Sequence, residues 1–299
     1  MALRSAPSLI GYTVVCRKLM LSTPEPRITI VTPSFQQARF LPWTIRSVTA
    51  QDYANLEYLV CDGGSSDGSV DVIRSYAKRI SWWCSEYDGG QTQAINKGFQ
   101  RATGEIVGWL NSDDMLLPGC LRKVAEAFRD PSVEAICGWG VMMSEQGRVR
   151  RRWVHAQPTA RVLRSEGLLF QPAVFWRRRL HNTFGFLDES FRFTMDREWF
   201  ARLAAGGVVP RLLPRCLAAY RVHAATKTSM IGDVGAFESE RVLKMHGNSK
   251  SRPARVSWDW RARNRAWQIT LEKLGQVLPP WWRGRDVHRT VAFISSQTT

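Results

Sequence analysis

Metal-binding cysteine motifs and long apolar runs are both missing from this chain of 299 residues. The six cysteines are scattered without Cys-x-x-Cys spacing, which argues against a zinc site or a disulfide framework and favours buried, reduced thiols. No apolar run approaches the roughly 20 residues that span a bilayer, so an integral membrane protein is not expected. The apolar residues 9–16 precede Arg17 and Lys18 rather than a small-residue cleavage site, so the sequence predicts no signal peptide and a cytoplasmic protein.

Several nucleotide and metal motifs are absent as well. No Gly-x-Gly-x-x-Gly or Gly-x-x-x-x-Gly-Lys-Ser/Thr segment stands at a strand-to-helix junction, which disfavours a dinucleotide enzyme and a P-loop NTPase. No His-Glu-x-x-His segment occurs, and there is no internal repeat. Hydrophobic residues make up 44% and charged residues 23% of the chain, which is ordinary globular usage and excludes low-complexity and collagen-like classes.

Positive charge is concentrated in the second half of the chain. The formal net charge is +16, yet residues 1–147 hold 14 basic against 15 acidic side chains, whereas residues 148–299 hold 28 against 11. Eight of the thirteen tryptophans share that basic half. Arginine interleaved with tryptophan suits a phosphate-rich partner, such as a nucleic acid, an anionic membrane surface or a polyprenyl-phosphate or glycolipid acceptor. A solvated basic face without a ligand is an equally good interpretation.

Strands and helices alternate strictly through the first half. Short β-branched runs predict strands, and apolar residues at helical spacing predict helices. The expected strands are residues 28–34, 56–62, 80–85 and 105–110, and the expected helices are residues 40–51, 70–76, 92–101 and 118–128. This alternation predicts an α/β fold with a mostly parallel sheet, helices on both faces, and ligands at the carboxyl ends of the strands.

The second half is less regular. Its expected elements are an antiparallel strand pair at 136–142 and 148–154, strands at 171–176 and 212–221, a helix over 193–205 that opens just after Asp196, and helices at 237–245 and 258–274. The expected organisation is an N-terminal extension (1–26), a main domain (27–230) and a basic, Trp-rich helical C-terminal extension (231–299). From its Arg and Trp content, residues 250–285 are predicted to dock on anionic lipid.

Acidic or amide residues close the strands of the first half. The members of this set are Asp62, Asp67, Asp88, Asn111, Asp113 and Asp114. Carboxylates gathered on one rim need a divalent cation, basic side chains, or hydrogen-bonding bases and riboses. The segment Asn111–Asp114 suits Mg²⁺ or Mn²⁺ bound jointly with substrate phosphates. An Asx turn that caps the next helix accounts for it equally well.

Several motifs together resemble the family 2 glycosyltransferases of GT-A fold, in order and in spacing. They are ITIVTPSF (28–35), DGGSSDG (62–68), SEYDGG (85–90) followed by AINKG (94–98), and ATGE (102–105) leading to WLNSDD (109–114). The resemblance runs from about residue 27 to 230. It implies one GT-A-like domain that binds a nucleotide-diphosphate sugar and transfers the sugar with inversion at the anomeric carbon.

The resemblance also assigns a donor site. Pro33, Ser34 and Phe35 match the end of the family's first strand beside the nucleobase, and Asp62 matches the acid that reads base or ribose. Asn111 to Asp114 match the acidic metal and diphosphate motif, with Asn111 where many members have Asp. The expected nucleotide-sugar-binding residues are therefore Pro33, Ser34, Phe35, Asp62, Asp67, Gly90, Gln91, Asn96, Asn111 and Asp113. The expected Mg²⁺ or Mn²⁺ ligands are Asp113, Asp114 and His223, the last from a late His segment of the family.

Asp196 matches the family's catalytic base, although the acid that normally precedes it is Met195 here. Inverting transfer is a single displacement, so one carboxylate must accept the acceptor hydroxyl's proton while positive charge stabilises the departing diphosphate. An unexceptional pKa would suffice for that base. A helix N-cap is the structural alternative for Asp196, and a hydrogen-bonded structural role is the alternative for His223.

The resulting hypothesis is a metal-dependent inverting glycosyltransferase. Its acceptor would be a saccharide or lipid-linked molecule in cell-envelope glycolipid or polysaccharide synthesis, reached from the cytoplasm or from the cytoplasmic membrane face, and no nucleic acid is expected. The alternative is a non-catalytic GT-A-fold protein that binds nucleic acid or anionic membrane through its basic half. The alternative predicts loss of Asp113, Asp114 or Asp196, and all three are present. A sugar nucleotidyltransferase would need a Gly-rich basic loop after its first strand, where this chain has Ser34–Arg39.

Overall fold

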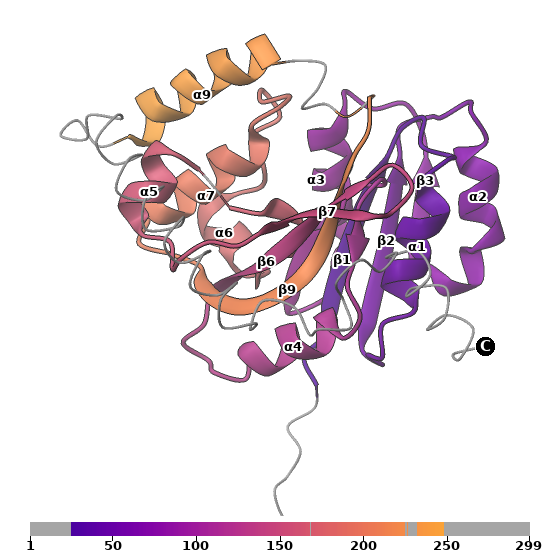
Figure 1. Ribbon diagram of the computed structural model, residues 1–299, viewed down its shortest axis with the longest axis horizontal. Helices are drawn as coiled ribbons and strands as arrows, with labels where there is room; N and C mark the ends of the chain where they lie inside the picture. Colours follow the sequence, from indigo (N-terminus) through magenta and orange to yellow (C-terminus); the bar gives the residue numbers. More distant parts are fainter. Residues whose placement is uncertain (1–24, 168, 225, 227–231, 248–299) are drawn as a thin grey trace, which may run out of the picture.

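Four parallel strands form one side of the sheet (Figure 1). They are β1 (Ile28–Ser34), β2 (Leu56–Asp62), β3 (Trp82–Ser85) and β4 (Ile106–Trp109), in the spatial order β3-β2-β1-β4. All seven residues of β1 are buried, as expected for a central strand covered on both faces. This computed structural model describes residues 25–167, 169–224, 226 and 232–247. The predicted helix at 258–274, the lipid-docking prediction for 250–285 and nearly all of the N-terminal extension lie outside those residues.

The other side of the sheet is built from β5 (Met115–Leu116), β6 (Ala135–Ser144), β7 (Val149–Trp153), β8 (Val174–Arg177) and β9 (Arg211–Val222). β8 lies antiparallel to both β4 and β6, whereas β9 runs parallel to β6. β7 pairs with β6 across a short turn, which permits only antiparallel pairing, as predicted. The sheet is thus parallel up to β4 and mixed beyond it, a curled nine-stranded sheet within the described part of the chain.

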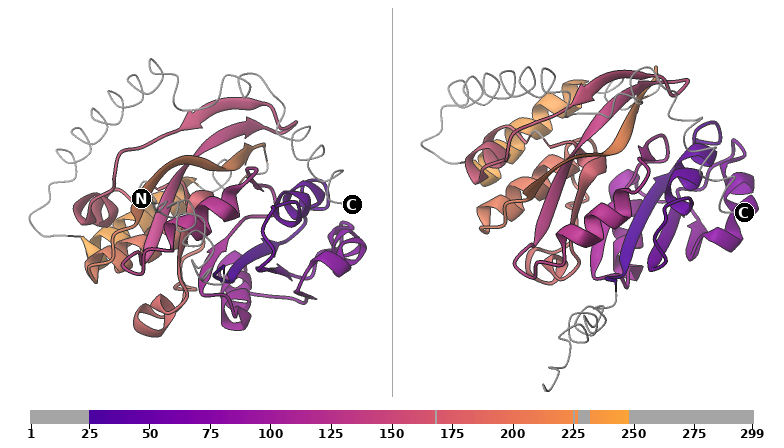
Figure 2. Two further views of the ribbon diagram at one scale, coloured as in Figure 1. Left: turned by 90° about the horizontal axis from the view of Figure 1, so that it is seen from below. Right: turned by 60° about the horizontal axis from the view of Figure 1, so that its bottom comes forward.

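Helices cover both faces of the sheet (Figure 2). On one face lie α1 (Leu41–Thr49), α2 (Ser69–Ser75) and α4 (Cys120–Ala127), whose apolar residues join Ile28, Ile30 and Val60 in one core. On the other lie α3 (Gln91–Arg101), α5 (Ala160–Ser165), α6 (Leu180–Phe184) and α7 (Met195–Ala205). Their core includes Val31 and Leu59, since neighbouring strand residues point to opposite faces.

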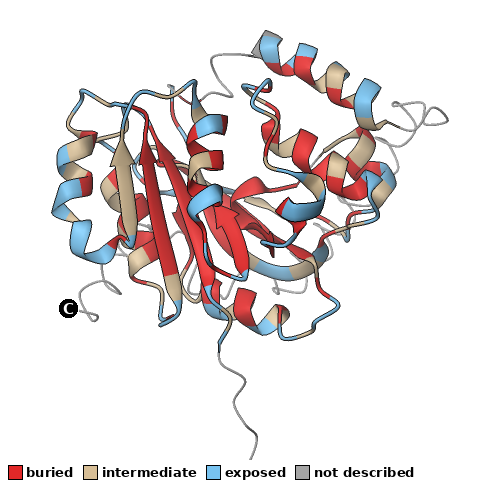
Figure 3. Ribbon diagram, turned by 180° about the vertical axis from the view of Figure 1, so that it is seen from behind, coloured by how far each residue is buried: buried red, intermediate tan, exposed pale blue. Residues whose placement is uncertain are grey.

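The helix α9 (Gly232–His246) packs against α7 and α5 at the outer edge of that second layer (Figure 1). Short 3₁₀ turns occur at Ala77–Arg79 and Gln171–Ala173. The central strands are buried and the outer helix faces exposed (Figure 3). Within the described part of the chain, no helix is long and apolar enough to cross a membrane.

Trp109 and Trp199 are buried core residues that pack around Trp176. Three of the described thiols are buried, as predicted, whereas those of Cys84 and Cys216 are half-buried. The five described cysteines form no disulfide: Cys61, Cys84, Cys120, Cys137 and Cys216.

Candidate active site

The ends of β1 and β2 meet at one edge of the sheet. Ser34 lies opposite Asp62, and the Gly63 N–H donates to the Ser34 carbonyl at 2.8 Å. The Ser34 hydroxyl is buried and has no hydrogen-bond partner in the described part of the chain. The next residue, Phe35, is 60% exposed. Phe35 therefore presents an exposed aromatic ring at this edge, of the kind on which a nucleobase can stack.

The Asp62 carboxylate organises the loop that follows β2. Its Oδ2 accepts hydrogen bonds from the N–H of Gly64 (3.1 Å), the N–H of Ser65 (2.8 Å) and the hydroxyl of Ser85 (2.7 Å). Its Oδ1 accepts from the Ser65 hydroxyl at 2.7 Å. Asp62 therefore holds the rim together from a buried position at the strand end.

Asp67 ties the start of α2 to the loop after β1. It accepts hydrogen bonds from the N–H of Ala38 (2.9 Å) and from the N–H and hydroxyl of Ser69 (3.0 and 2.6 Å). Burial alone would raise the pKa of Asp67, but these hydrogen bonds lower it below its usual value. The N-cap of α2 is Gly68, where the chain turns through a left-handed conformation.

Asp88 lies against the same loop. Its two carboxylate oxygens would stand 3.1 Å from a Cβ added at Gly63, so a larger residue there would require the Asp88 side chain to shift. Burial raises the pKa of Asp88, and the Gly90 N–H, which donates to Asp88 at 2.9 Å, partly offsets that effect. Gly90 has a φ of 122°, which glycine alone adopts readily, and α3 begins at the next residue.

A chain of amides leads from α3 to the acidic motif. Gln91 Nε2 donates to Asn111 Oδ1 at 2.7 Å, and Asn111 Nδ2 donates to Asp114 Oδ2 at 3.3 Å. An Asp at position 111 could not donate and would add another negative charge beside Asp113 and Asp114. The departure from the family's usual Asp therefore has a physical reason. Asn96 is not part of this chain of amides. Its buried side chain donates to the carbonyl of Leu187 and accepts from the N–H of Leu187.

Asp114 is a buried anchor. Its side chain is 0% exposed, its Oδ1 accepts the Arg221 N–H at 3.0 Å, and its carbonyl accepts the Thr44 hydroxyl at 2.7 Å. Burial and the neighbouring Asp113 raise the pKa of Asp114 well above its usual range. Asp114 is therefore buried, and Asp113 is the more exposed of the two neighbouring carboxylates in the expected metal set. No group of three or more His, Cys, Asp or Glu side chains arranged to hold a metal occurs among the residues that the structure describes.

Asp113 and His223 do come together at the rim. His223 Nε2 lies 3.0 Å from Asp113 Oδ2, and the Asp113 side chain keeps 17% of its surface exposed. The His223 ring packs against Phe40 with ring centroids 4.5 Å apart. A carboxylate oxygen and an imidazole nitrogen are both accepted ligands of Mn²⁺, and the carboxylate suits Mg²⁺.

Arg221 supports this pair from behind, a role that the sequence did not reveal. It is completely buried, its Nε donates to the Asp113 carbonyl at 2.8 Å, and one Nη donates to the Glu145 carbonyl at 2.7 Å. Its guanidinium carbon lies 4.9 Å from the centre of the Phe40 ring. Arginine in the strand before a site histidine is not distinguishable by pattern from an ordinary strand residue, so sequence reasoning had no signal for it.

Asp196 is the second residue of α7, and the helix begins one residue before it rather than after it. Its side chain is half-buried, and its Oδ1 accepts the N–H of Arg197 at 2.7 Å. The N-cap of α7 is Thr194, so Asp196 is not the cap. Desolvation raises the pKa of Asp196, whereas the sequence argument expected an unexceptional one. A higher pKa makes this carboxylate a stronger base.

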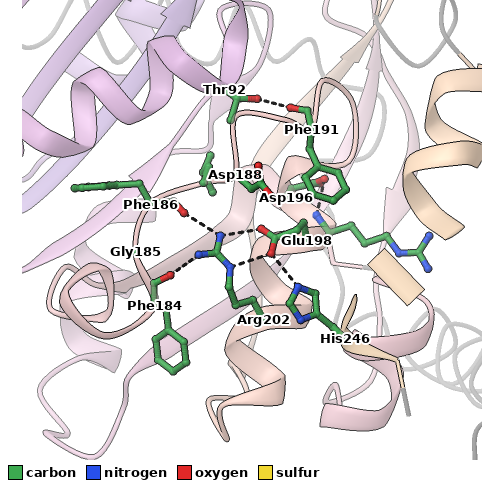
Figure 4. Close-up of polar contacts among 12 residues, drawn as sticks. Thr92, Phe184, Gly185, Phe186, Asp188, Phe191, Asp196, Glu198, Arg202 and His246 are labelled. Carbon is green, nitrogen blue, oxygen red and sulfur yellow. Dashed lines mark hydrogen bonds and ion pairs between the residues drawn. The ribbon is translucent and has the colours of Figure 1, made fainter. Parts of the chain in front are cut away.

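Two turns of α7 carry a buried ion-pair network that sequence reasoning missed (Figure 4). Glu198 is 1% exposed and accepts hydrogen bonds from Arg202 at 2.9 and 2.8 Å. His246 of α9 places its Nε2 2.9 Å from Glu198 Oε1. Arg202 also donates to the carbonyl of Phe186 at 2.8 Å. The Glu-x-x-x-Arg spacing was a visible signal for the pair but not for its burial.

Comparison with known proteins decides the family. The family model described as Glycosyl transferase family 2 matches residues 29–188, more than half of the chain. The chain belongs to glycosyl transferase family 2. As a member, it is 30% identical over 187 residues to an uncharacterized glycosyltransferase of Mycobacterium tuberculosis, covering 61% of this chain and 70% of that protein.

Two further relatives of this family 2 glycosyltransferase add to the comparison. It is 34% identical over 105 residues to the GalNAc(5)-diNAcBac-PP-undecaprenol beta-1,3-glucosyltransferase of Campylobacter jejuni, over 34% of each chain. The crystal structure of S. aureus TarS 1-349 in complex with UDP-GlcNAc superposes with a TM-score of 0.59 at 17% identity, covering 77% of this chain and 69% of that one. The chain spans 41% of the longer TarS chain. The likeness shows a GT-A-like α/β fold, as predicted.

Proposed function

We propose that this family 2 glycosyltransferase moves a sugar from a nucleotide-diphosphate sugar to an acceptor hydroxyl, with inversion at the anomeric carbon. The observation that carries the proposal is the pairing of Asp113 with His223 at 3.0 Å on the rim where β1, β2 and β4 end. That rim is where an α/β sheet presents its ligand site. TarS, which shares the fold, was crystallised with UDP-GlcNAc, which supports a nucleotide sugar as the donor.

Asp113 and His223 would hold Mg²⁺ or Mn²⁺ together with the donor diphosphate. The metal, when bound, would neutralise charge on the departing nucleoside diphosphate. The protein's own part is to orient Asp113, and Arg221 does so by donating to the backbone carbonyl of Asp113. Asp114 takes no direct part in this proposal and acts as the buried anchor of the loop.

The nucleoside would lie along the ends of β1 and β2. Phe35 offers the exposed ring, Ser34 lies buried at the strand end beside it, and Asp62 and Asp67 organise the hydrogen-bonded loop around them. Gln91 and Asn111 would face the sugar diphosphate, since they bridge α3 and the acidic motif. Pro33, near the end of β1, and Gly90, just before α3, would set the backbone conformation beside the donor.

Asp196 would act as the general base. Inversion requires one carboxylate that accepts the acceptor hydroxyl's proton as the sugar is transferred in a single displacement. The half-buried position of Asp196 and its raised pKa support that role. The alternative, a non-catalytic protein that binds nucleic acid or membrane, is less well supported because the carboxylates that such a protein is expected to lose, Asp113 and Asp196, are both present.

Transfer is best tested with a panel of UDP-, GDP- and dTDP-sugars and short saccharides that carry a lipid tail, by following release of the nucleoside diphosphate. The anomeric configuration of the product, read by NMR, tests inversion. An α-linked donor should give a β-linked product. Retention of configuration would contradict the single-displacement mechanism, and no release with any donor would favour the non-catalytic alternative.

The acceptor would be a saccharide or lipid-linked molecule at a membrane surface. The outer face of α9 supports this: Val234, Phe237 and Met245 are 38%, 72% and 49% exposed, at helical spacing. Lys244, which is also exposed, lies on the same face of the helix. The named acceptor of the C. jejuni relative is an undecaprenol-linked saccharide, which is consistent with cell-envelope synthesis.

Co-sedimentation with vesicles of phosphatidylcholine and phosphatidylglycerol tests the membrane contact. Phe237→Glu should reduce binding, since it places a negative charge in the centre of the exposed apolar face. Tyr87→Glu is the matched control, because Tyr87 is also an exposed aromatic residue, at 91%, but follows β3. Equal binding by wild type, Phe237→Glu and a chain lacking residues 250–285 would reject the membrane surface as a partner.

A further inference from the structure

Three consecutive backbone N–H groups just before α7 converge on one carboxylate from α9. Glu238 Oε1 accepts from Arg192 at 2.7 Å, and its Oε2 accepts from Phe193 at 2.9 Å and Thr194 at 2.8 Å. The Thr194 hydroxyl adds a fourth contact at 3.2 Å. Glu238 is 4% exposed, so these bonds form away from water. Charge-assisted hydrogen bonds of this kind are stronger than neutral ones.

These bonds lie at the entry to α7, and one of them is made by the N–H of its N-cap residue. Thr194 is the N-cap of α7 but caps no N–H of the helix with its own side chain. Glu238 places a full negative charge at the positive end of the helix dipole, where a carboxylate is stabilising. Asp196 follows Thr194 by two residues, so the backbone that carries the proposed base is fixed by a residue of another helix.

The loop before α7 is also bonded by residues of α3 and by a second residue of α9. From α3, the Thr92 hydroxyl donates to the Phe191 carbonyl at 2.8 Å (Figure 4), and the Asn96 amide donates to the Leu187 carbonyl at 2.9 Å. From α9, Arg241 donates to the Ser190 hydroxyl at 2.7 Å. The segment 187–194 thus lies between the helix that starts at the donor rim and α9.

We propose that Glu238 is a positioning residue for glycosyl transfer, which holds the start of α7 so that Asp196 is directed at the acceptor hydroxyl. This inference rests on the proposed function, in which Asp196 is the base. Under this proposal, α9 positions the base as well as packing against α7. None of the family motifs includes Glu238, which lies beyond the part of the chain matched by the family model.

The charge of Glu238 also reaches Asp196. Desolvation is the main cause of the raised pKa of Asp196, and the negative charge of Glu238 raises it further. The opposing charge is Arg197 on α7 itself, which Glu166 also faces from the end of α5. Replacing Glu238 by a neutral residue therefore lowers the pKa of Asp196. The base would then stay ionised to lower pH, and the acidic limb of the pH–rate profile would move to lower pH.

The test compares Glu238→Gln and Glu238→Asp with Glu240→Gln, an exposed glutamate of the same helix that pairs with Lys244. Release of nucleoside diphosphate from the sugar nucleotide that the enzyme turns over gives kcat and KM across pH. Glu238→Gln should lower kcat by about 10- to 100-fold with an unchanged donor KM, as expected when a reacting group is misplaced. Its acidic limb should move to lower pH. Glu238→Asp keeps the charge, so it should lose kcat without that movement.

The control Glu240→Gln should match the wild type in both kcat and pH profile. Wild-type kcat in both Glu238 variants would overturn the proposal, as would equal losses of kcat and donor affinity, which indicate general structural damage. If Glu238→Gln does not fold, as judged by its thermal transition, a wild-type kcat in Glu238→Asp would overturn the proposal and a reduced kcat with unchanged donor KM would support it. Turnover that survives in Asp196→Asn would instead contradict the proposed function itself.

Discussion

His223 Nε2 lies 3.0 Å from Asp113 Oδ2, although the two residues are 110 positions apart in the chain. The short strand β5 creates this contact. Met115 pairs with Ala219 of β9 in antiparallel register, which brings the residues before β5 alongside the residues that end β9. Two paired residues per strand therefore join the acidic motif to the late histidine.

Loss of Asp113 should weaken the metal-dependent part of donor binding. Asp113→Ala removes the partly exposed carboxylate of the pair, and a drop of about 100-fold in nucleoside diphosphate affinity with Mn²⁺ is expected, by analogy with altered metal sites. Affinity in the presence of a chelator should not change. Isothermal titration calorimetry measures both. Asp71→Asn, an exposed acid on α2, is the control, and an equal effect of the two variants would contradict the role of Asp113.

Loss of Asp114 should act on stability instead. Asp114→Ala leaves the buried backbone N–H of Arg221 without its acceptor, and an unsatisfied buried donor costs about 1 to 3 kcal/mol. Asp114→Asn keeps an oxygen for the Arg221 N–H and should cost less. Urea unfolding measures the difference. If Asp114→Ala unfolds at the wild-type midpoint but loses all metal-dependent binding, Asp114 is a metal ligand after all.

Removal of the proposed base should abolish turnover and spare donor binding. Asp196→Asn keeps the shape of the side chain but cannot accept a proton at neutral pH, so kcat should fall by about 1,000-fold. The affinity for the nucleoside diphosphate should remain within twofold of the wild type, since Asp196 belongs to a different element from Asp113. A parallel loss of affinity would contradict the division of roles between the two carboxylates.

The folded state should lose stability in mild acid through His181. Burial lowers the pKa of His181 to about 4 from the usual 6.5, and its ring stacks on Phe186 and Trp199. Between pH 6.5 and pH 4, His181 therefore binds a proton in the unfolded chain but not in the folded one. The contribution of the neutral, buried His181 to the free energy of unfolding is complete above pH 6.5 and declines as the pH falls towards 4. In His181→Gln, the slope of unfolding free energy against pH in that range should decrease by up to about 1.4 kcal/mol per pH unit. Identical slopes would contradict a neutral buried imidazole.

Regular elements with a clear period were predictable from the sequence. β1 and β2 have the predicted ends, and α3 begins one residue earlier than predicted, because their apolar pattern is long and their ends carry glycine or acidic residues. β5, α5 and α6 were missed. A two-residue strand and helices of six and five residues are too short to show a period, and they form because tertiary contacts support them.

The candidate site was predictable as far as its residues sit at strand ends. Asp62 and Asp113 were found in that way, since parallel strands bring their carboxyl ends to one rim. The burial of Asp114 was not predictable, because spacing in the chain does not say which way a side chain points. Arg221 and Glu238 were missed because their roles come from partners about 110 and 45 residues away. Such pairings follow from the fold and leave no local pattern.

Calorimetric titration with UDP, GDP and dTDP, first with Mn²⁺ or Mg²⁺ and then with a chelator, tests the central claim most directly. The account predicts that one of these nucleotides binds with the metal present and that binding weakens sharply when the metal is removed. It also predicts that Asp113→Ala and His223→Ala abolish this dependence on metal. Failure of all three nucleotides to bind under either condition would contradict a nucleotide-sugar transferase.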